Sequence, residues 1–142
     1  MNRAALDSFI REAEALGVLN VVALRGGATV FEHHFQKEIR YNNYSIAKSV
    51  TSLAVGIAEA EGLVSLDEWV LNCFPEDVPS NPGANLRAVT VRDLLTMCLG
   101  QDEWHLSGAE RLALGAGTNW TRYVLGKAFP NRPGEVFLYN NV

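Results

Sequence analysis

The stretch "YNNYSIAKSVTSLAVGIAEAEGLVSLDE", from Tyr41 to Glu68, is the most informative part of the chain. Its apolar residues lie on most sides of a helical repeat, which predicts a buried helix from Ile46 to Glu61, ended by Gly62. A serine at 45 and a lysine at 48 open this otherwise apolar run. Residues three apart lie on one face of a helix, so the hydroxyl and the amine are expected side by side.

The Ser-x-x-Lys pattern allows two interpretations. A chain of this length contains such a pair by chance roughly every second time; in that case Ser45 caps the helix and Lys48 faces solvent. In the other interpretation, Lys48 is buried, and desolvation together with the helix dipole favours its neutral amine. That amine accepts the proton of Ser45 and generates a nucleophile, while the Ser45 amide donates to a developing oxyanion. The apolar surroundings argue for a buried helix and so against the first interpretation, but the local pattern alone leaves both interpretations open.

Composition limits the classes of function. The 142 residues suit one domain with an ordinary core, and 48% hydrophobic with 20% charged residues is typical of a soluble globular protein. A net charge of -4 with scattered basic residues argues against nucleic-acid binding and against an anionic membrane surface. The N-terminus is charged, and no apolar stretch is long enough to span a bilayer. We therefore expect a cytoplasmic chain.

The N-terminal part predicts a helix followed by a hairpin. Apolar residues from Leu6 to Leu16 recur at helical spacing and Gly17 ends the pattern. "VLNVVAL" and "TVFEHHF" are expected strands, joined by a turn at "RGGA". A lone hairpin is marginal in water, so the strand inventory looks incomplete.

Capping signals predict the later helices. Ser65 with Glu68, and Thr90 with Asp93, have the spacing of capping boxes, which predicts one helix from Leu66 and another closed by Gly100. A third helix is expected at 119–128, a surface loop at 72–89, and an extended segment at the C-terminal end.

Several other polar residues carry no recognisable site. Cys73 and Cys98 form no CxxC pair, so a zinc site is not expected. His33 and His34 are neighbours on a strand and point to opposite faces, and His105 is expected on an exposed loop. No metal or organic cofactor is implied. The tryptophans are expected in the core or at a domain edge; they are Trp69, Trp104 and Trp120.

Three separated segments resemble one superfamily. "YSIAKSVTSLAVGIAEAEGLVSLDE" resembles the nucleophile helix of serine β-lactamases and penicillin-binding proteins. "AVTVRDLLTMCLG" is similar to the "LLTHTSG" segment of the branch that contains class C β-lactamases, D-alanyl carboxypeptidases and related esterases. "RPGEVFLYNN" is similar to its "PGxxFxYSN" segment, which carries a Tyr-x-Asn motif. The three occur in the order of the family, across residues 18–141.

The resemblance implies a role for each matching residue. Ser45 would be the acylated nucleophile, Lys48 its proton partner, Tyr139 the general base or acid, and Asn141 the side chain that orients the lysine and the substrate. A phenol beside an ammonium loses its proton more easily, so Tyr139 can shuttle a proton. Without the resemblance, Tyr139 would be interpreted as a half-buried strand aromatic.

The chain departs from the family pattern in two places. Met97 and Leu99 stand where many relatives have His and Ser. The Lys-Thr-Gly or His-x-Gly strand, which supplies half of the oxyanion hole, is absent. The resemblance thus implies an α+β, β-lactamase/transpeptidase-like fold that is incomplete: residues 1–38 as helix and hairpin of the mixed domain, and 39–142 as the helical domain, with C-terminal strands missing.

The expected function is acyl transfer from a small-molecule ester, amide or β-lactam through a Ser45 acyl-enzyme. Two alternatives stay open. The chain could be a truncated, incompetent fragment or half of a split protein, completed by a C-terminal partner or by a second copy that covers the hairpin edge. It could also be a β-lactam-binding sensor that is acylated without turnover. The sequence does not identify the substrate.

Overall fold

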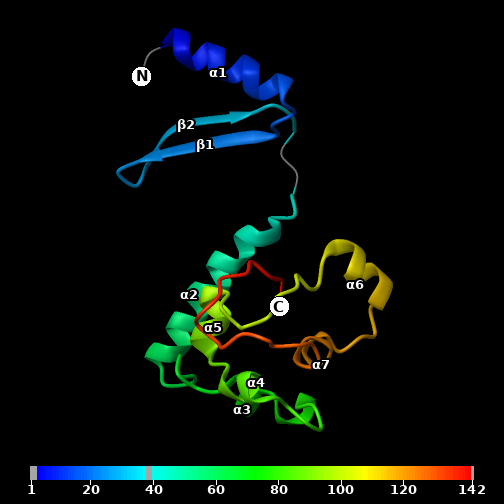
Figure 1. Cartoon of the computed structure of the whole chain (residues 1–142). Helices are drawn as coiled ribbons and strands as arrows, with labels where there is room; N and C mark the ends of the chain where they lie inside the picture. Colours follow the sequence, from blue (N-terminus) through cyan, green and yellow to red (C-terminus); the bar gives the residue numbers. More distant parts are fainter. Residues whose placement is uncertain (1–2, 38–39, 142) are drawn as a thin grey trace. The chain divides into compact units, whose positions relative to one another are not determined.

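The computed structural model describes residues 3–37 and 40–141. Two compact units follow one another along the chain, Met1–Tyr44 and Ser45–Val142 (Figure 1). The expected boundary between 1–38 and 39–142 falls on residues outside the described ranges, and this domain assignment stays a prediction.

The first unit is a helix followed by a two-stranded antiparallel sheet. Helix α1 spans Arg3–Ala15, strand β1 Asn20–Arg25 and strand β2 Ala28–His34. Gly26 and Gly27 adopt positive φ angles of 58° and 79°, which glycine allows at little cost, and so form the tight turn. The helix and the hairpin predicted from the sequence are confirmed.

One face of the hairpin packs aromatic side chains. The rings of Phe9 in α1 and Phe31 in β2 make an edge contact with centroids 6.4 Å apart. His33 lies in the same row, half-buried, 4.5 Å from the Phe35 ring centroid, whereas His34 is exposed and contacts Glu32. The two histidines therefore point to opposite faces, as predicted.

The second unit is helical. Its longest helix, α2, spans Ala47–Ala60 and follows a single 3₁₀ turn at Tyr44–Ile46. The core of the unit is formed by four buried side chains with half-buried Leu71, Leu94 and Phe129 around them; the four are Val70, Leu86, Val89 and Leu125. The other elements are α3 Val70–Cys73, η2 Pro75–Asp77, α4 Ala84–Ala88, α5 Val91–Thr96, α6 Gly108–Leu114 and α7 Trp120–Leu125.

The helix predicted from Leu66 is wrong. The Ser65 hydroxyl accepts the N–H of Asp67 in a local turn, and no capping box forms with Glu68. The backbone from 66 to 70 instead pairs with 89–92: Arg92 N–H donates to the Leu66 carbonyl, and Val91 N–H to that of Glu68. These long-range hydrogen bonds satisfy the groups that a helix would have used. The helix α3 begins only after this pairing ends.

The capping box at Thr90 is confirmed. Its hydroxyl accepts the N–H of Asp93, whose carboxylate accepts the N–H of Thr90. The helix α5 ends earlier than expected, at Thr96, and Met97 after it adopts a left-handed φ of 57°. Gly100 lies beyond it at φ 93°, where an added Cβ would stand 2.3 Å from the Asn131 carbonyl oxygen. Only glycine permits this close approach of two backbone segments.

The predicted burial of α2 is wrong for the described residues. None of its side chains is buried, and Val50, Leu53 and Ile57 are 67%, 67% and 53% exposed. The apolar residues on this face of α2 are therefore exposed in the described part of the chain. Among the described residues, no helix is both long and apolar enough to span a membrane.

Candidate active site

Ser45 and Lys48 lie side by side at the start of α2. Ser45 is in the 3₁₀ turn and Lys48 in the first turn of the helix, with 3.4 Å between the amine Nζ and the hydroxyl Oγ. The proximity expected from their spacing is therefore present. Ser45 is exposed and Lys48 half-buried, which is less burial than the sequence predicted.

The C-terminal segment brings a third side chain to the same amine. Lys48 Nζ donates to Asn141 Oδ1 over 3.0 Å. The Tyr139 ring lies on the same side, its centroid 5.5 Å from Nζ, which is within the range of a cation–π contact. No described hydrogen bond joins the Tyr139 hydroxyl to Ser45. The structure thus gathers the four predicted residues around one nitrogen, while their catalytic roles stay predictions.

Backbone pairing holds the segment that carries Tyr139 and Asn141. Leu138 N–H donates to the Met97 carbonyl over 3.0 Å, and Gly134 N–H to the Cys98 carbonyl over 2.8 Å. The residues at 97 and 99, which depart from the family pattern, therefore belong to the turn that positions the Tyr-x-Asn motif. Their side chains are not needed for these main-chain bonds.

The surroundings of Lys48 are polar but carry no paired carboxylate. Its two hydrogen-bond partners are the Ser45 hydroxyl and the Asn141 amide oxygen, both neutral. The four ion pairs found among the described residues do not include Lys48.

A mainly apolar cavity of about 510 Å³ opens at this amine. Lys48 and Asn141 line one part of it together with Thr51 and Ser52 of α2. The rest is lined by aliphatic and aromatic side chains, among them Val55, Leu94, Val124 and Phe129. An apolar cavity with a few converging polar groups is the usual form of a small-molecule site.

A comparison with protein-family models identifies the family of the chain. The family model described as Beta-lactamase matches residues 5–142. The chain belongs to the beta-lactamase family. Membership supports the α+β fold class and a serine hydrolase-like superfamily, as the motifs predicted. No curated protein sequence matches the chain.

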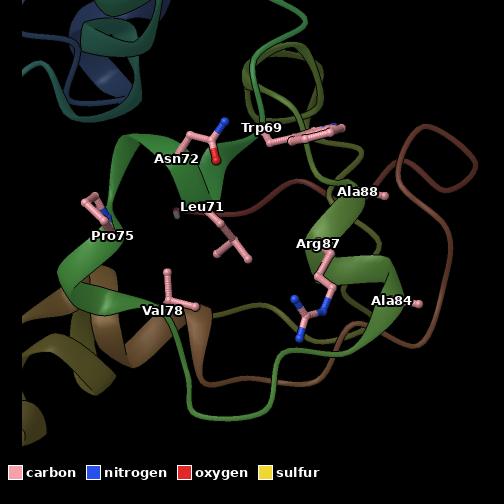
Figure 2. A pocket seen from close by; sticks show the side chains of 8 residues that line it. All are labelled: Trp69, Leu71, Asn72, Pro75, Val78, Ala84, Arg87 and Ala88. Atoms are coloured by element: carbon pink, nitrogen blue, oxygen red, sulfur yellow. The ribbon is translucent and has the colours of Figure 1, made fainter.

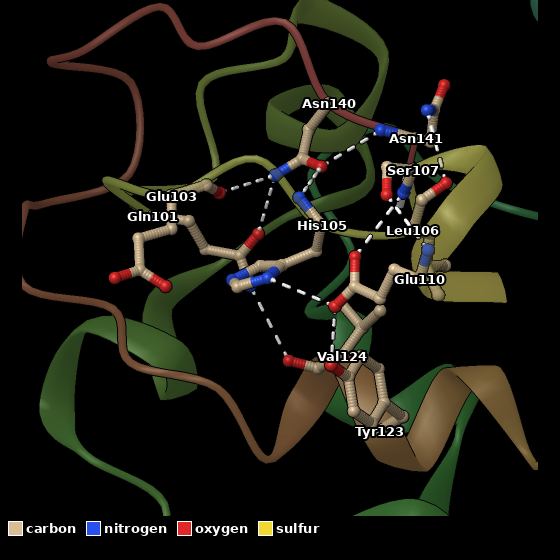
Figure 3. Close-up of polar contacts among 10 residues, drawn as sticks. All are labelled: Gln101, Glu103, His105, Leu106, Ser107, Glu110, Tyr123, Val124, Asn140 and Asn141. Carbon is tan, nitrogen blue, oxygen red and sulfur yellow. Dashed lines mark hydrogen bonds and ion pairs between the residues drawn. The ribbon is translucent and has the colours of Figure 1, made fainter. Parts of the chain in front are cut away.

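In this beta-lactamase family member, a buried polar cluster around Asn140 adjoins Asn141 (Figure 3), and the sequence analysis did not predict it. Asn140, between the two motif residues, is 2% exposed and bonds to four partners. His105 is 6% exposed and donates its backbone N–H to Asn140 Oδ1, so the expected exposed loop is wrong at this position. The burial follows from contacts 35 residues apart, for which the local sequence holds no signal.

Glu110 and Tyr123 extend the cluster. Glu110 completes a capping box with Ser107 at the start of α6, and the Tyr123 hydroxyl donates to its carboxylate. This hydrogen bond, helped by backbone N–H donors and by nearby His105, holds the pKa of Glu110 below its ordinary value. The "SGAE" pattern at 107–110 was a capping signal in the sequence, and α6 was not predicted from it.

Strained backbone borders the site. Among the described residues, three other than glycine have positive φ: Tyr44 at 44°, Met97 at 57° and Leu106 at 55°. Tyr44 directly precedes Ser45, the Met97 carbonyl accepts from Leu138, and the Leu106 carbonyl accepts from the Asn141 side chain. Residues held in such conformations concentrate at functional sites, where surrounding contacts enforce them.

The second cavity and the remaining candidate residues show no catalytic arrangement. The larger hollow of about 960 Å³ in Figure 2 is lined by Trp69, Leu71 and Arg87 among others, and its lining holds no nucleophile or acid–base pair. Within the described residues, no three His, Cys, Asp or Glu side chains gather as a metal site. Cys73 and Cys98 are both free thiols. The three tryptophans are 42% to 57% exposed, which fits the edge of a unit rather than its core.

Proposed function

We propose that the chain is a serine hydrolase domain that transfers the acyl group of an ester, amide or β-lactam to Ser45 and then to water. The observation that carries the proposal is the position of Lys48 Nζ, 3.4 Å from the Ser45 hydroxyl and 3.0 Å from the Asn141 amide oxygen. A neutral amine has two N–H donors and one lone pair. With one N–H directed to Asn141, the lone pair can face the serine proton.

The reaction follows from these contacts. Ser45 Oγ attacks the carbonyl carbon as its proton passes to Lys48 Nζ, and the Ser45 backbone N–H at the start of α2 is the candidate donor to the oxyanion. The tetrahedral intermediate collapses, and the leaving alcohol or amine takes the proton, with Tyr139 as the shuttle. Water then attacks the acyl-enzyme by the reverse sequence, releasing a carboxylic acid and restoring the Ser45 hydroxyl.

The cavity supports a substrate with an apolar part. Its polar lining is formed by Lys48 and Asn141 with three hydroxyl side chains, Thr51, Ser52 and Thr121, while the remainder is aliphatic and aromatic. Burial of apolar surface contributes about 25 cal/mol per Å², so a hydrocarbon side chain binds there better than a charged one. Esters and amides of apolar acids are therefore the first substrates to test.

The test is covalent labelling of the full chain. The protein is incubated with a fluorescent penicillin or with p-nitrophenyl butyrate, quenched, and analysed by intact mass and peptide mapping. An adduct on Ser45 is expected, and Ser45→Ala should abolish it. Ser49→Ala is the matched control, since Ser49 lies one position beyond Lys48 on the same helix and is exposed.

The time course separates the candidate functions. An adduct that forms and decays with release of product supports a hydrolase. A stable adduct without turnover favours the sensor. Labelling that is absent, or that persists in Ser45→Ala, contradicts the proposal for this chain.

A further inference from the structure

Asn140 uses every hydrogen-bonding position of its amide. Its Nδ2 donates to Gln101 Oε1 over 3.0 Å and to the Glu103 carbonyl over 3.1 Å. Its Oδ1 accepts from the His105 N–H over 2.8 Å and from the Asn141 N–H over 2.9 Å. An amide has two donors and two good acceptor positions, so none is left over. Figure 3 shows this side chain between the 101–107 segment and the C-terminal segment.

The same bonds fix the neighbouring residue. The N–H of Asn141 is held by Asn140 Oδ1, and the Asn141 side chain donates to the Leu106 carbonyl over 3.3 Å. Backbone and side chain of Asn141 are thus both held, and its Oδ1 is left pointing to Lys48 Nζ. A rotation about the Asn141 backbone would break the contact with Lys48.

We propose that Asn140 is a positioning residue of the site: it sets the orientation of Asn141, and through Asn141 that of the Lys48 amine. The catalytic part of this inference rests on the proposed function. Asn140 has no described contact with Ser45 or Lys48, so its effect must pass through Asn141.

The geometry explains why an amide is required. In Asn140→Asp, both side-chain atoms become oxygens, and one would face the Gln101 and Glu103 oxygens at about the present 3.0 and 3.1 Å. In Asn140→Leu, the buried N–H of His105 loses its acceptor and the Glu103 carbonyl loses a donor. Either change weakens the connection between the 139–141 segment and the 101–106 segment, which then depends more on the hydrogen bond from the Asn141 side chain to the Leu106 carbonyl.

The first measurement reads the Lys48 amine itself. The ¹H–¹³C resonance of the Lys48 ε-methylene is recorded in the wild type and in Asn141→Ala, Asn140→Leu and Asn140→Asp. Asn140→Leu should move the resonance most of the way to its position in Asn141→Ala, and Asn140→Asp in the same direction. Asn85→Leu is the control, because Asn85 is half-buried and, like Asn140, donates its side-chain amide to a backbone carbonyl, that of Phe129, over 2.8 Å.

The second measurement is the rate of Ser45 acylation, corrected for the folded fraction. Misplacement of a catalytic group by about 1 Å can cost 10²-fold, so Asn140→Leu is expected to slow acylation by about 10- to 100-fold. In an Asn141→Ala background the same substitution should add almost nothing, since coupled residues are non-additive. Asn85→Leu should be additive with Asn141→Ala.

The outcomes separate this proposal from the proposed function. A Lys48 resonance that stays at its wild-type position in both Asn140 variants overturns the positioning role, as does an equal rate loss in both backgrounds. If the wild type is never acylated, the hydrolase proposal fails, whereas the resonance still decides whether Asn140 controls the Asn141–Lys48 contact. Asn140→Asp keeps the test available should Asn140→Leu not fold.

Discussion

Lys48 and Asn141 are hydrogen-bonded over 3.0 Å although 93 positions separate them in the chain. The contact joins the first turn of α2 to Asn141, the last described residue, and so connects the two ends of the second unit. It depends on the main-chain pairing of the turn after α5 with the C-terminal segment, where Leu138 N–H donates to the Met97 carbonyl. Function at Ser45 is therefore predicted to depend on the integrity of both segments.

Replacement of Lys48 should remove proton transfer while sparing the fold. Lys48→Met keeps the length and apolar stem of the side chain but has no basic nitrogen. Positioned acid–base groups contribute typically 10²–10⁴-fold, so Ser45 acylation is expected to fall by about that factor. The measurement is the second-order rate of adduct formation by intact mass.

Lys127→Met is the matched control for this substitution. The Lys127 amine also lies over a tyrosine ring, 4.0 Å from the centroid of Tyr123, and has no described contact with Ser45. It should leave acylation within about twofold, since cation–π contacts at exposed sites affect stability modestly. An equal loss in both variants would refute a specific role of Lys48.

Tyr139 allows its ring and its hydroxyl to be tested separately. Tyr139→Phe keeps the ring beside Lys48, 5.5 Å from the amine, and removes only the phenol oxygen. If the hydroxyl shuttles the proton, this variant should lose about 10²-fold in acylation or deacylation, as much as Tyr139→Leu. A rate near the wild type in Tyr139→Phe with a loss in Tyr139→Leu would assign the ring a packing role alone.

Local pattern predicted one half of the site and the resemblance the other half. The spacing of Ser45 and Lys48 on a helix is a local property, and their proximity followed from it. Nothing in the spacing of Tyr139 and Asn141 brings them to α2; only their likeness to a family motif did. The role of Asn140 had no sequence signal, because its four partners come from tertiary pairing of two distant segments.

Three capping patterns in the chain show the limit of predicting helices from local sequence. "TVRD" at 90–93 and "SGAE" at 107–110 both form capping boxes, whereas "SLDE" at 65–68 does not. The four residues of each pattern do not explain the difference, because each has a serine or threonine followed by an acidic residue three positions later. The backbone of 66–70 has a competing partner at 89–92, and those long-range hydrogen bonds replace the helix.

This difference predicts unequal costs for two similar substitutions. Thr90→Ala removes the side-chain half of a formed capping box and should lower the free energy of unfolding by about 1 kcal/mol. Ser65→Ala removes only an exposed turn contact to the Asp67 N–H and should cost clearly less. Urea denaturation of both variants and the wild type gives the comparison. Equal costs would mean that Ser65 caps a helix after all.

The lowered pKa of Glu110 predicts how the stability of the chain depends on pH. Its folded-state pKa is lowered from 4.5, first by the hydrogen bond from the Tyr123 hydroxyl. The native state therefore binds this proton less readily than the unfolded chain. The resulting stabilisation is complete above the unfolded value and is lost as the pH falls through the folded one. At pH 7 the wild type should melt at a higher temperature than Glu110→Gln, and the gap should narrow as the pH falls below the unfolded-state pKa of 4.5.

The glutamine variant isolates the charge, because Gln at this position still completes a capping box with Ser107. Tyr123→Phe removes the largest cause of the lowered pKa and should reduce the pH dependence of the melting temperature while leaving the carboxylate in place. Glu135→Gln, at an exposed position, is the control for loss of one negative charge. A gap between wild type and Glu110→Gln that stays constant from pH 7 to pH 3 would show that the carboxylate is not stabilised in the folded chain.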